Sequence, residues 1–259
     1  MRLTLLGTGT SFGVPQVGCR CPVCQSDDQH DRRTRTAALV ETAGTTLLID
    51  TPPELRLQLV NAAVARLDAV LYTHEHADHV NGIDDLRVFS IRRDGPLPLH
   101  GPPAAIAHLR TAFPYIFDES AVIPAGTSRP RLDTHVLTEG VSVNIHGLDV
   151  LPIGFDHGTT RVFGYRIGPV AYATDVKAVT PEALAALKGV EVLVMSALWW
   201  RPHPTHQSIP EAVEVARAVG ARQTWLTHLS HETAHRDLAA RLPSDIQPAH
   251  DGLTLEIPT

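Results

Sequence analysis

The chain has 259 residues, 43% of them hydrophobic and 19% charged, which is enough apolar material for one compact domain spanning residues 1–259. No segment approaches the roughly 18 consecutive apolar residues of a membrane span, and the N-terminus lacks a signal-peptide core, so we expect a cytoplasmic protein without a membrane partner. The formal net charge of −6 argues against a nucleic-acid partner, since binding to phosphates needs clustered Lys and Arg, but it allows a small anionic substrate.

The first quarter of the chain alternates predicted strands with loops. Residues 3–6 predict a short strand, and a loop rich in Gly and Thr follows at residues 7–15. We reject a dinucleotide-binding turn there, because the third glycine of G-x-G-x-x-G comes one residue late. The next predicted elements are strands at 38–42 and 45–50, a helix at 53–65 and a buried strand at 67–73.

Three cysteines lie together with the spacing C-x-C-x-x-C, at Cys19, Cys21 and Cys24. In a chain without a secretion signal, this odd number favours metal ligation over disulfides. Thiolates at such spacing favour a tetrahedral zinc site, here a zinc-binding loop near residues 19–24. Since the chain has no fourth cysteine, a distant histidine must complete the site if it is structural. The alternative is a reduced surface loop that binds no metal.

The sequence HEHADH at residues 74–79 directly follows the strand predicted at 67–73. Three imidazoles and a carboxylate at the end of a buried strand predict a metal site, although a solvated histidine-rich loop is the alternative. Asp50 ends the preceding strand and either holds this ligand loop from behind or simply lies on the surface. The candidate ligands of the motif are His74, His76, Asp78 and His79.

Further chemical residues follow predicted strands in the rest of the chain. A helix is expected at 81–93 and a strand at 97–100, and the irregular stretch 104–129 contains three aromatic residues, Phe113, Tyr115 and Phe117, that either cover the site or pack in the core. Strands are then expected within 136–152 and at 163–167, 170–173, 190–195 and 224–227, and helices at 181–187 and 210–219. The residues that follow these strands are His157, Asp175 and His228, and the loop 196–206 holds His203 and His206.

Strand ends meet at one rim when helices cover the faces of a parallel or mixed sheet, so these distant residues can converge. Five imidazoles and two carboxylates suffice for two ions about 3.5–4 Å apart if Asp175 bridges them. One ion would then be held by His74, His76, His157 and Asp175, and the other by Asp78, His79, Asp175 and His228. Such ligands suit zinc, manganese or iron.

The motif, the later isolated ligands and the order of strands and helices resemble the metallo-β-lactamase superfamily. That resemblance implies an α/β fold, an αββα sandwich of two mixed sheets flanked by helices, with a binuclear site along one edge. The loop 7–15, the cysteines and the segment 227–231 resemble more narrowly the phosphoribosyl cyclic phosphodiesterase family. This second resemblance implies that His231 is the fourth ligand of the cysteine site and that His206 contacts the substrate phosphate or protonates the leaving oxygen, with His203 as a competitor. It also implies a possible homodimer.

The ligand set and the resemblance together predict a binuclear metal-dependent phosphodiesterase. Its substrate would be a small cyclic phosphodiester such as phosphoribosyl 1,2-cyclic phosphate, attacked by a metal-activated hydroxide. Asp78 would orient the hydroxide, and His206 would assist the leaving oxygen. The expected cofactors are two Mn or Zn ions at the active site and one structural Zn. The alternatives are a tRNA 3′-processing endonuclease, a glyoxalase-type thioesterase and a noncatalytic zinc protein.

Overall fold

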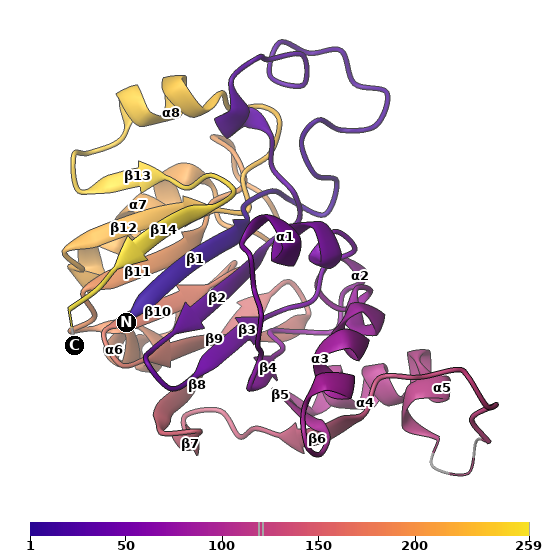
Figure 1. Ribbon diagram of the computed structural model, residues 1–259. Coiled ribbons are helices and arrows are strands. Elements are labelled where there is room, and N and C mark those ends of the chain that lie inside the picture. The colour runs from indigo at the N-terminus through magenta and orange to yellow at the C-terminus, as the bar shows by residue number, and fades with distance from the viewer. Residues whose placement is uncertain (119, 121, 259) are drawn as a thin grey trace.

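The computed structural model describes residues 1–118, 120 and 122–258, and it contains two mixed sheets of seven strands each (Figure 1). The first sheet has the strand order β14 (Leu253–Glu256), β1 (Arg2–Gly7), β2 (Ala37–Glu41), β3 (Thr46–Ile49), β4 (Ala69–Leu71), β5 (Leu97–Gly101) and β6 (Leu132–Val136). The second has the order β13 (Ile246–Pro248), β12 (Gln223–Thr227), β11 (Val192–Ser196), β10 (Val170–Ala173), β9 (Thr160–Ile167), β8 (Leu148–His157) and β7 (Val143–Ile145).

Helices cover the outer face of each sheet (Figure 1). The first sheet carries α1 (Leu55–Asn61), α2 (Ala77–Val80), α3 (Arg87–Arg92), α4 (Pro103–Ala112) and α5 (Pro114–Phe117). The second sheet carries α6 (Pro181–Leu187), α7 (Ile209–Val219) and α8 (His235–Arg241). The α/β sandwich of two mixed sheets flanked by helices, predicted from the sequence, is therefore confirmed. Among the described residues, no helix has the length and apolar character needed to cross a membrane.

The strands are apolar on both faces because each sheet packs between two layers. Along β3, Leu47 and Ile49 pack against the other sheet, whereas Leu48 points towards the helices on the outside. Along β11, Val194 belongs to the core between the sheets and Met195 to the core under α6 and α7. Because successive side chains point to opposite faces of a strand, each strand contributes side chains to two separate cores. These strands therefore appear in the sequence as continuous apolar runs.

The directions of the strands bring their ends to one rim. β3, β4, β5 and β6 are parallel in the first sheet, and β10, β11, β12 and β13 are parallel in the second. The carboxyl ends of each set therefore lie at the same edge of their sheet, where ligand sites of open α/β sheets form.

Three parts of the sequence prediction differ from the structure in detail. The helix expected at 81–93 is split into a 3-10 turn over Ile83–Leu86 and α3, and the helix expected at 53–65 is shorter, as α1. The stretch 104–129, expected to be irregular, lies mostly in α4 and α5 up to residue 117, and each of these helices starts with a proline in its first turn. Phe113 and Phe117 pack on the outer core of the first sheet. Positions 119 and 121 lie outside the described residues.

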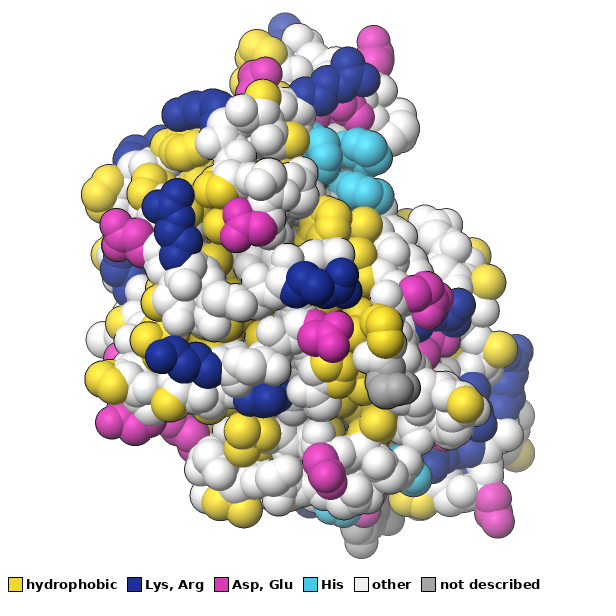
Figure 2. Space-filling model, turned by 90° about the vertical axis from the view of Figure 1, so that its left-hand side faces the viewer, with side chains coloured by type: hydrophobic (Ala, Val, Ile, Leu, Met, Phe, Trp, Pro, Cys, Tyr) yellow, Lys and Arg dark blue, Asp and Glu magenta, His cyan; other side chains and the backbone are white. Residues whose placement is uncertain are grey.

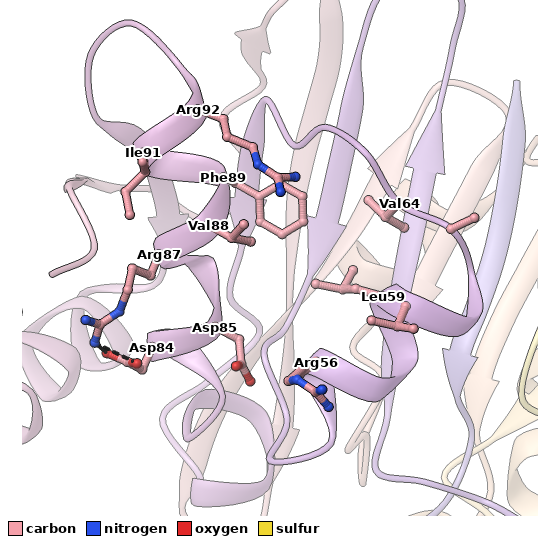
Figure 3. A pocket seen from close by; sticks show the side chains of 12 residues that line it. Arg56, Leu59, Val64, Asp84, Asp85, Arg87, Val88, Phe89, Ile91 and Arg92 are labelled. Atoms are coloured by element: carbon pink, nitrogen blue, oxygen red, sulfur yellow. Dashed lines mark hydrogen bonds and ion pairs between the residues drawn. The ribbon is translucent and has the colours of Figure 1, made fainter. Parts of the chain in front are cut away.

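A cavity of about 730 Å³ forms a groove between α1 and α3 (Figure 3). Apolar side chains such as Leu59, Val88 and Phe89 line it, and the ion pair between Arg87 and Asp84 lies at its edge, with 2.6 Å between the charged atoms. No histidine or cysteine lines this groove, so the chemistry of the molecule lies elsewhere.

Candidate metal centres

The motif at residues 74–79 lies where β4 leads into α2. β4 ends at Leu71, His74 follows in a buried loop, and α2 carries Asp78 and His79. The backbone N–H of His79 donates to the carbonyl of His76 (2.9 Å), and its own carbonyl accepts from the N–H of Thr51 (2.7 Å). The motif is thereby held in a tight turn at the carboxyl end of a buried strand.

The second sheet supplies the three later candidates at the facing rim. His157 is the last residue of β8, Asp175 comes two residues after β10, and His228 comes directly after β12. All three side chains are buried. The convergence predicted from strand ends is thus what the structure contains: residues from both sheets meet at one edge.

The ligand atoms form overlapping groups whose members lie within 4.8 Å of one another. One group is His74, His76 and His157, another is Asp78, His79 and His228, and Asp175 forms a third group with His74 and His79. His228 Nε2 also lies 3.3 Å from Asp175 Oδ1, and His79 Nε2 lies 3.2 Å from Asp175 Oδ2. Asp175 therefore lies beside His74 of one proposed ligand set and beside His79 and His228 of the other, as a carboxylate shared by two ions requires.

The donor atoms of this cluster fit divalent cations. The Nε2 atoms of His74, His79 and His228 are buried and have no hydrogen-bond partner among the described residues. Burying polar atoms without partners is costly, so their convergence on a buried carboxylate indicates that a bound group satisfies them. Imidazole nitrogens and carboxylate oxygens are ligands for zinc and manganese.

The charge states are also those of metal ligands. Burial lowers the pKa of His74 and of His228, which keeps both rings neutral and able to donate a lone pair. Burial opposes the ionisation of Asp175, but His228 and His79 outweigh it and hold the pKa of this carboxyl well below its ordinary value. Burial also lowers the pKa of His79, but Asp175 and Asp50 raise it more, so a cation would displace a proton there.

Each of three ligand rings is oriented by a hydrogen bond from its other nitrogen. His79 Nδ1 donates to Asp50 Oδ2 (2.8 Å), His74 Nδ1 donates to the hydroxyl of Thr73 (3.0 Å), and His157 Nδ1 donates to the carbonyl of Thr205 (2.8 Å). Such bonds fix the ring orientation and leave Nε2 free for metal. Asp50 is therefore buried behind the ligand loop, and the surface position considered from the sequence is wrong.

Three residues of the cluster have left-handed backbone conformations that side chains disfavour. The φ angles are +63° at Asp50, +58° at Asp175 and +56° at His228. Conformations of this kind cost free energy and concentrate at functional sites. Together with the buried unpartnered nitrogens, they mark this rim as a site built for a ligand.

The cysteines form a second centre with His231. The Sγ atoms of Cys19, Cys21 and Cys24 lie 3.3, 3.5 and 3.5 Å from His231 Nδ1. Zinc–sulfur and zinc–nitrogen bonds of ordinary length at a tetrahedral angle put the sulfur and nitrogen atoms about 3.5 Å apart. These four side chains therefore fit a closed tetrahedral zinc site, which we call the cysteine site.

The comparisons with known proteins agree with this geometry. The family described as "Beta-lactamase superfamily domain" matches residues 45–229. A ribonuclease Z from Mycobacterium sp. (strain KMS) is 31% identical over 255 residues, which cover 88% of this chain and 84% of that protein. The chain belongs to the metallo-β-lactamase superfamily.

Two further proteins are more similar to this chain. An octanoyltransferase from Porphyromonas gingivalis is 39% identical over 256 residues and covers 98% of this chain, which spans about half (51%) of that protein's length. The crystal structure of a diphosphatase from the PhnP family is 37% identical, has a TM-score of 0.92 and covers 99% of this chain and 98% of that chain. This metallo-β-lactamase fold protein is thus a metal-dependent hydrolase, and its fold implies divalent metal ions.

The metallo-β-lactamase site opens into a cavity of about 410 Å³. Sequence reasoning missed several of its walls, namely Ser11, Thr159, Thr160 and Thr205. Hydroxyl residues in loops, such as Ser11 in the Gly- and Thr-rich loop 7–15, carry no sequence signal of a position at a site. Gly7 and Gly9 are required in that loop, since a Cβ on either would lie 2.0 Å from the carbonyl oxygen of Arg35 or 2.7 Å from that of Arg33.

The two histidines of the loop 196–206, His203 and His206, differ in their position relative to the cavity. His206 lines the cavity, and its buried Nδ1 has no hydrogen-bond partner among the described residues. This nitrogen lies 3.6 Å from Asp175 Oδ1, and His206 forms a group of possible ligands with His157 and Asp175, whose ligand atoms lie within 4.8 Å of one another. His203 lies farther out, its ring centroid 5.1 Å from that of His206. The loop is held at both ends, because the N–H of Leu198 donates to the carbonyl of Gln207 (2.9 Å) and that of Ile209 to the carbonyl of Trp199 (2.7 Å).

Replacing Asp50 with Ala is expected to weaken active-site metal binding by roughly 10- to 100-fold. The change removes the carboxylate that accepts the hydrogen bond from His79 Nδ1. It also removes the two hydrogen bonds that the N–H and the hydroxyl of Thr73 donate to Asp50, each at 2.8 Å. Metal titration by isothermal calorimetry measures the effect. Asp50→Asn keeps an acceptor for His79 and should lose less metal affinity than Asp50→Ala. Equal metal affinity in Asp50→Ala and wild type would contradict the orienting role of Asp50.

Zinc affinity of the cysteine site is expected to rise with pH. Burial raises the pKa of Cys24 to about 11 in the metal-free protein. Burial acts the same way on Cys21, but the N–H of Cys24 and the neighbouring cysteines outweigh it and lower the pKa to about 7. Zinc must displace each thiol proton, so these two cysteines should contribute a slope of about two log units per pH unit below pH 7 and about one above. Competition with a chelator at pH 6, 7 and 8 tests this, and a pH-independent affinity would exclude thiolate ligation.

Proposed function

We propose that the protein is a binuclear phosphodiesterase that hydrolyses a small cyclic phosphodiester such as phosphoribosyl 1,2-cyclic phosphate. The observation that carries the proposal is the meeting of two ligand groups at Asp175 beside an open cavity of about 410 Å³. Paired ions in one cleft suit displacement at phosphorus, where charge builds on several oxygens at once. The 37% identity to a diphosphatase from the PhnP family supports chemistry at phosphorus.

In this proposal Asp175 is shared between two divalent ions, Mn or Zn. His74, His76 and His157 complete one set of ligands, and Asp78, His79 and His228 complete the other. Bound ions of this kind polarise phosphoryl oxygens and lower the pKa of water. A structural Zn would occupy the cysteine site.

Asp78 and His206 are the residues proposed to act directly on the reactants. Asp78 stays ionised because His79 holds the pKa of its carboxyl below the ordinary value against the opposing effect of burial, so its free lone pairs can orient the attacking water. Burial lowers the pKa of His206 to about 3 in the substrate-free protein. A bound phosphate would favour the protonated ring, which could then donate its proton to the leaving oxygen.

A tRNA 3′-processing endonuclease is the second candidate, favoured by the 31% identity to a ribonuclease Z. The charge of the chain favours the small substrate instead. The net charge is −6, and on the face drawn in Figure 2 basic and acidic side chains are interspersed without a basic patch. RNA binding depends on clustered positive charge.

The experiment is a screen of the protein loaded with manganese or with zinc. Phosphoribosyl 1,2-cyclic phosphate, bis-p-nitrophenyl phosphate, a nucleoside diphosphate and a precursor tRNA are compared at physiological salt, with chelator-treated protein as the control. We expect metal-dependent hydrolysis with the highest kcat/KM on the cyclic phosphate. Cleavage of the tRNA alone would favour the second candidate, and no hydrolysis of any phosphodiester would overturn both.

Location and assembly complete the proposal. The three cysteines form no disulfide, and zinc-binding thiolates persist in reducing compartments, which supports a cytoplasmic location. A homodimer is predicted, and light scattering of the purified protein measures its mass against the 28.1 kDa chain.

A further inference from the structure

Three histidines outside the metal-site cavity lie together, and a group of histidine side chains is visible at the surface in the upper part of Figure 2. His30 belongs to the 3-10 turn Gln29–Asp31, His235 is the first residue of α8, and His250 lies in the turn between β13 and β14. We call these three residues the histidine cluster. The metal ligands and the chemistry proposed above do not account for it.

The rings of the histidine cluster are about as close as those of the proposed active-site ligands. The ring centroid of His30 lies 4.6 Å from that of His235 and 4.1 Å from that of His250, and the last two are 5.9 Å apart. In the all-histidine group of the active site, the corresponding distances are 4.5, 5.3 and 5.7 Å. Three imidazoles at this spacing are within reach of one ion.

The cluster differs from the active site in the orientation of its rings. His30 and His250 stack at an interplanar angle of 27°, and the three residues do not form a group whose ligand atoms lie within 4.8 Å of one another. The side chain of His30 is exposed, and exposed side chains change rotamer within nanoseconds. A turn of this ring would direct a nitrogen towards the other two rings. The cluster would therefore close around an ion that binds to it.

The other two rings each have a nitrogen available for a ligand. His235 Nδ1 is buried and has no hydrogen-bond partner among the described residues, which is costly unless a bound group satisfies it. His250 Nδ1 donates to the carbonyl of Asp251 (3.2 Å), which leaves Nε2 with its lone pair. Burial lowers the pKa of His235 to about 4 and also lowers that of His250, and His30 adds to both effects, so protons do not compete for these rings at pH 7.

The charged groups around the cluster favour a cation. Asp28 Oδ1 lies 3.7 Å from His30 Nδ1, so a carboxylate stands beside the exposed ring. The neighbouring arginines are each paired with an acid, Arg236 with Asp28 at 3.0 Å and Arg33 with Asp31 at 3.3 Å, which offsets their positive charge. Imidazoles are ligands for zinc, copper, nickel and iron, whereas calcium and magnesium prefer oxygen ligands.

We propose that the histidine cluster is a further metal site, in which His30, His235 and His250 bind one divalent transition cation, with Zn²⁺ as the probe. None of the three proposed ligands is fully buried, and none carries a negative charge to compensate the desolvation of the ion. The site should therefore bind zinc more weakly than the active site or the cysteine site and lose its ion when the protein is desalted. It has no part in the proposed hydrolysis.

An ion in the histidine cluster would brace the segment that carries His231. The backbone N–H of His235 donates to Asp31 Oδ1 (2.7 Å), and Asp31 pairs with buried Arg33. The guanidinium of Arg33 donates to two carbonyls on either side of His231, at 2.7 and 2.9 Å. Because the proposed ligands come from both ends of the chain, the bound ion should also stabilise the folded protein.

The test is equilibrium dialysis of zinc-loaded protein against micromolar free zinc, with metal analysis before and after desalting. Wild type should hold one ion more before desalting than after. His30→Gln should weaken the binding of this ion by roughly 10- to 100-fold or more, since loss of a ligand costs at least as much as loss of a residue that orients one. His235→Gln and His250→Gln should act in the same way. The control is His108→Gln, an exposed histidine of α4, which should bind like wild type.

Thermal unfolding gives a second readout. Zinc added to protein whose tighter sites are already filled should raise the Tm of wild type by several degrees and leave that of His30→Gln unchanged. Without added zinc the two Tm values should agree, because His30 is exposed. Absence of the further ion in wild type, equal uptake by His30→Gln, or an equal loss in His108→Gln would each overturn the proposal. None of these results would affect the phosphodiesterase function.

Discussion

The Asp175→Ala variant is expected to bind neither active-site ion and to lose activity on the order of 10⁴-fold or more. Asp175 groups with His74 of one proposed ligand set and lies 3.3 Å from His228 Nε2 and 3.2 Å from His79 Nε2 of the other, so both sets lose a member. Removing the buried negative charge also takes away much of the attraction that offsets the desolvation of two dications.

Metal analysis by inductively coupled plasma mass spectrometry checks this result. Wild type should hold three ions per chain and Asp175→Ala one, because the cysteine site lies in a different loop and keeps its zinc. Asp149→Ala is the control, since this carboxylate is exposed on β8 and accepts a hydrogen bond from the side chain of Asn144 (2.9 Å). An Asp175→Ala protein that retains two active-site ions, or full activity, would refute a shared carboxylate.

The ligand positions could be predicted because they obey a local rule. His74, His157, Asp175 and His228 each come at or just after the end of an apolar run, and such runs become strands whose ends converge. The pairing of the cysteines with His231 depends on a contact across more than 200 positions, which spacing alone does not reveal. It came from the family resemblance, and the distances of 3.3–3.5 Å agree with it.

The role of Asp50 could not be decided from sequence, since an aspartate that ends a strand is as often exposed as buried. Burial depends on what packs over the strand end, and here α2 and Thr73 do so. The length of the helix predicted at 81–93 was also wrong. The 3-10 turn before α3 does not interrupt the apolar pattern of these residues, so the sequence gives no sign of the break.

Replacing His206 with Gln is expected to lower kcat on a cyclic phosphodiester by roughly 10²- to 10⁴-fold, the usual contribution of a general acid. The imidazole lines the metal-site cavity, and its Nδ1 is buried without a hydrogen-bond partner among the described residues. Gln keeps a hydrogen-bonding group of similar reach but cannot be protonated. His203→Gln is the matched control, because His203 lies outside the metal-site cavity and should change kcat by no more than about three-fold.

The leaving group distinguishes an acid from a metal ligand at position 206. p-Nitrophenolate departs without a proton, whereas a ribose oxygen requires one, so His206→Gln should lose far less kcat on bis-p-nitrophenyl phosphate than on the cyclic substrate. A ligand of the ion held by His157 and Asp175 would instead affect both substrates equally and lower the metal content. If the metal content is unchanged and kcat falls only on the substrate with the poor leaving group, His206 is the residue that transfers the proton. Equal losses of kcat on both substrates, together with a missing ion, would instead make His206 a metal ligand. The leaving oxygen would then take its proton from water.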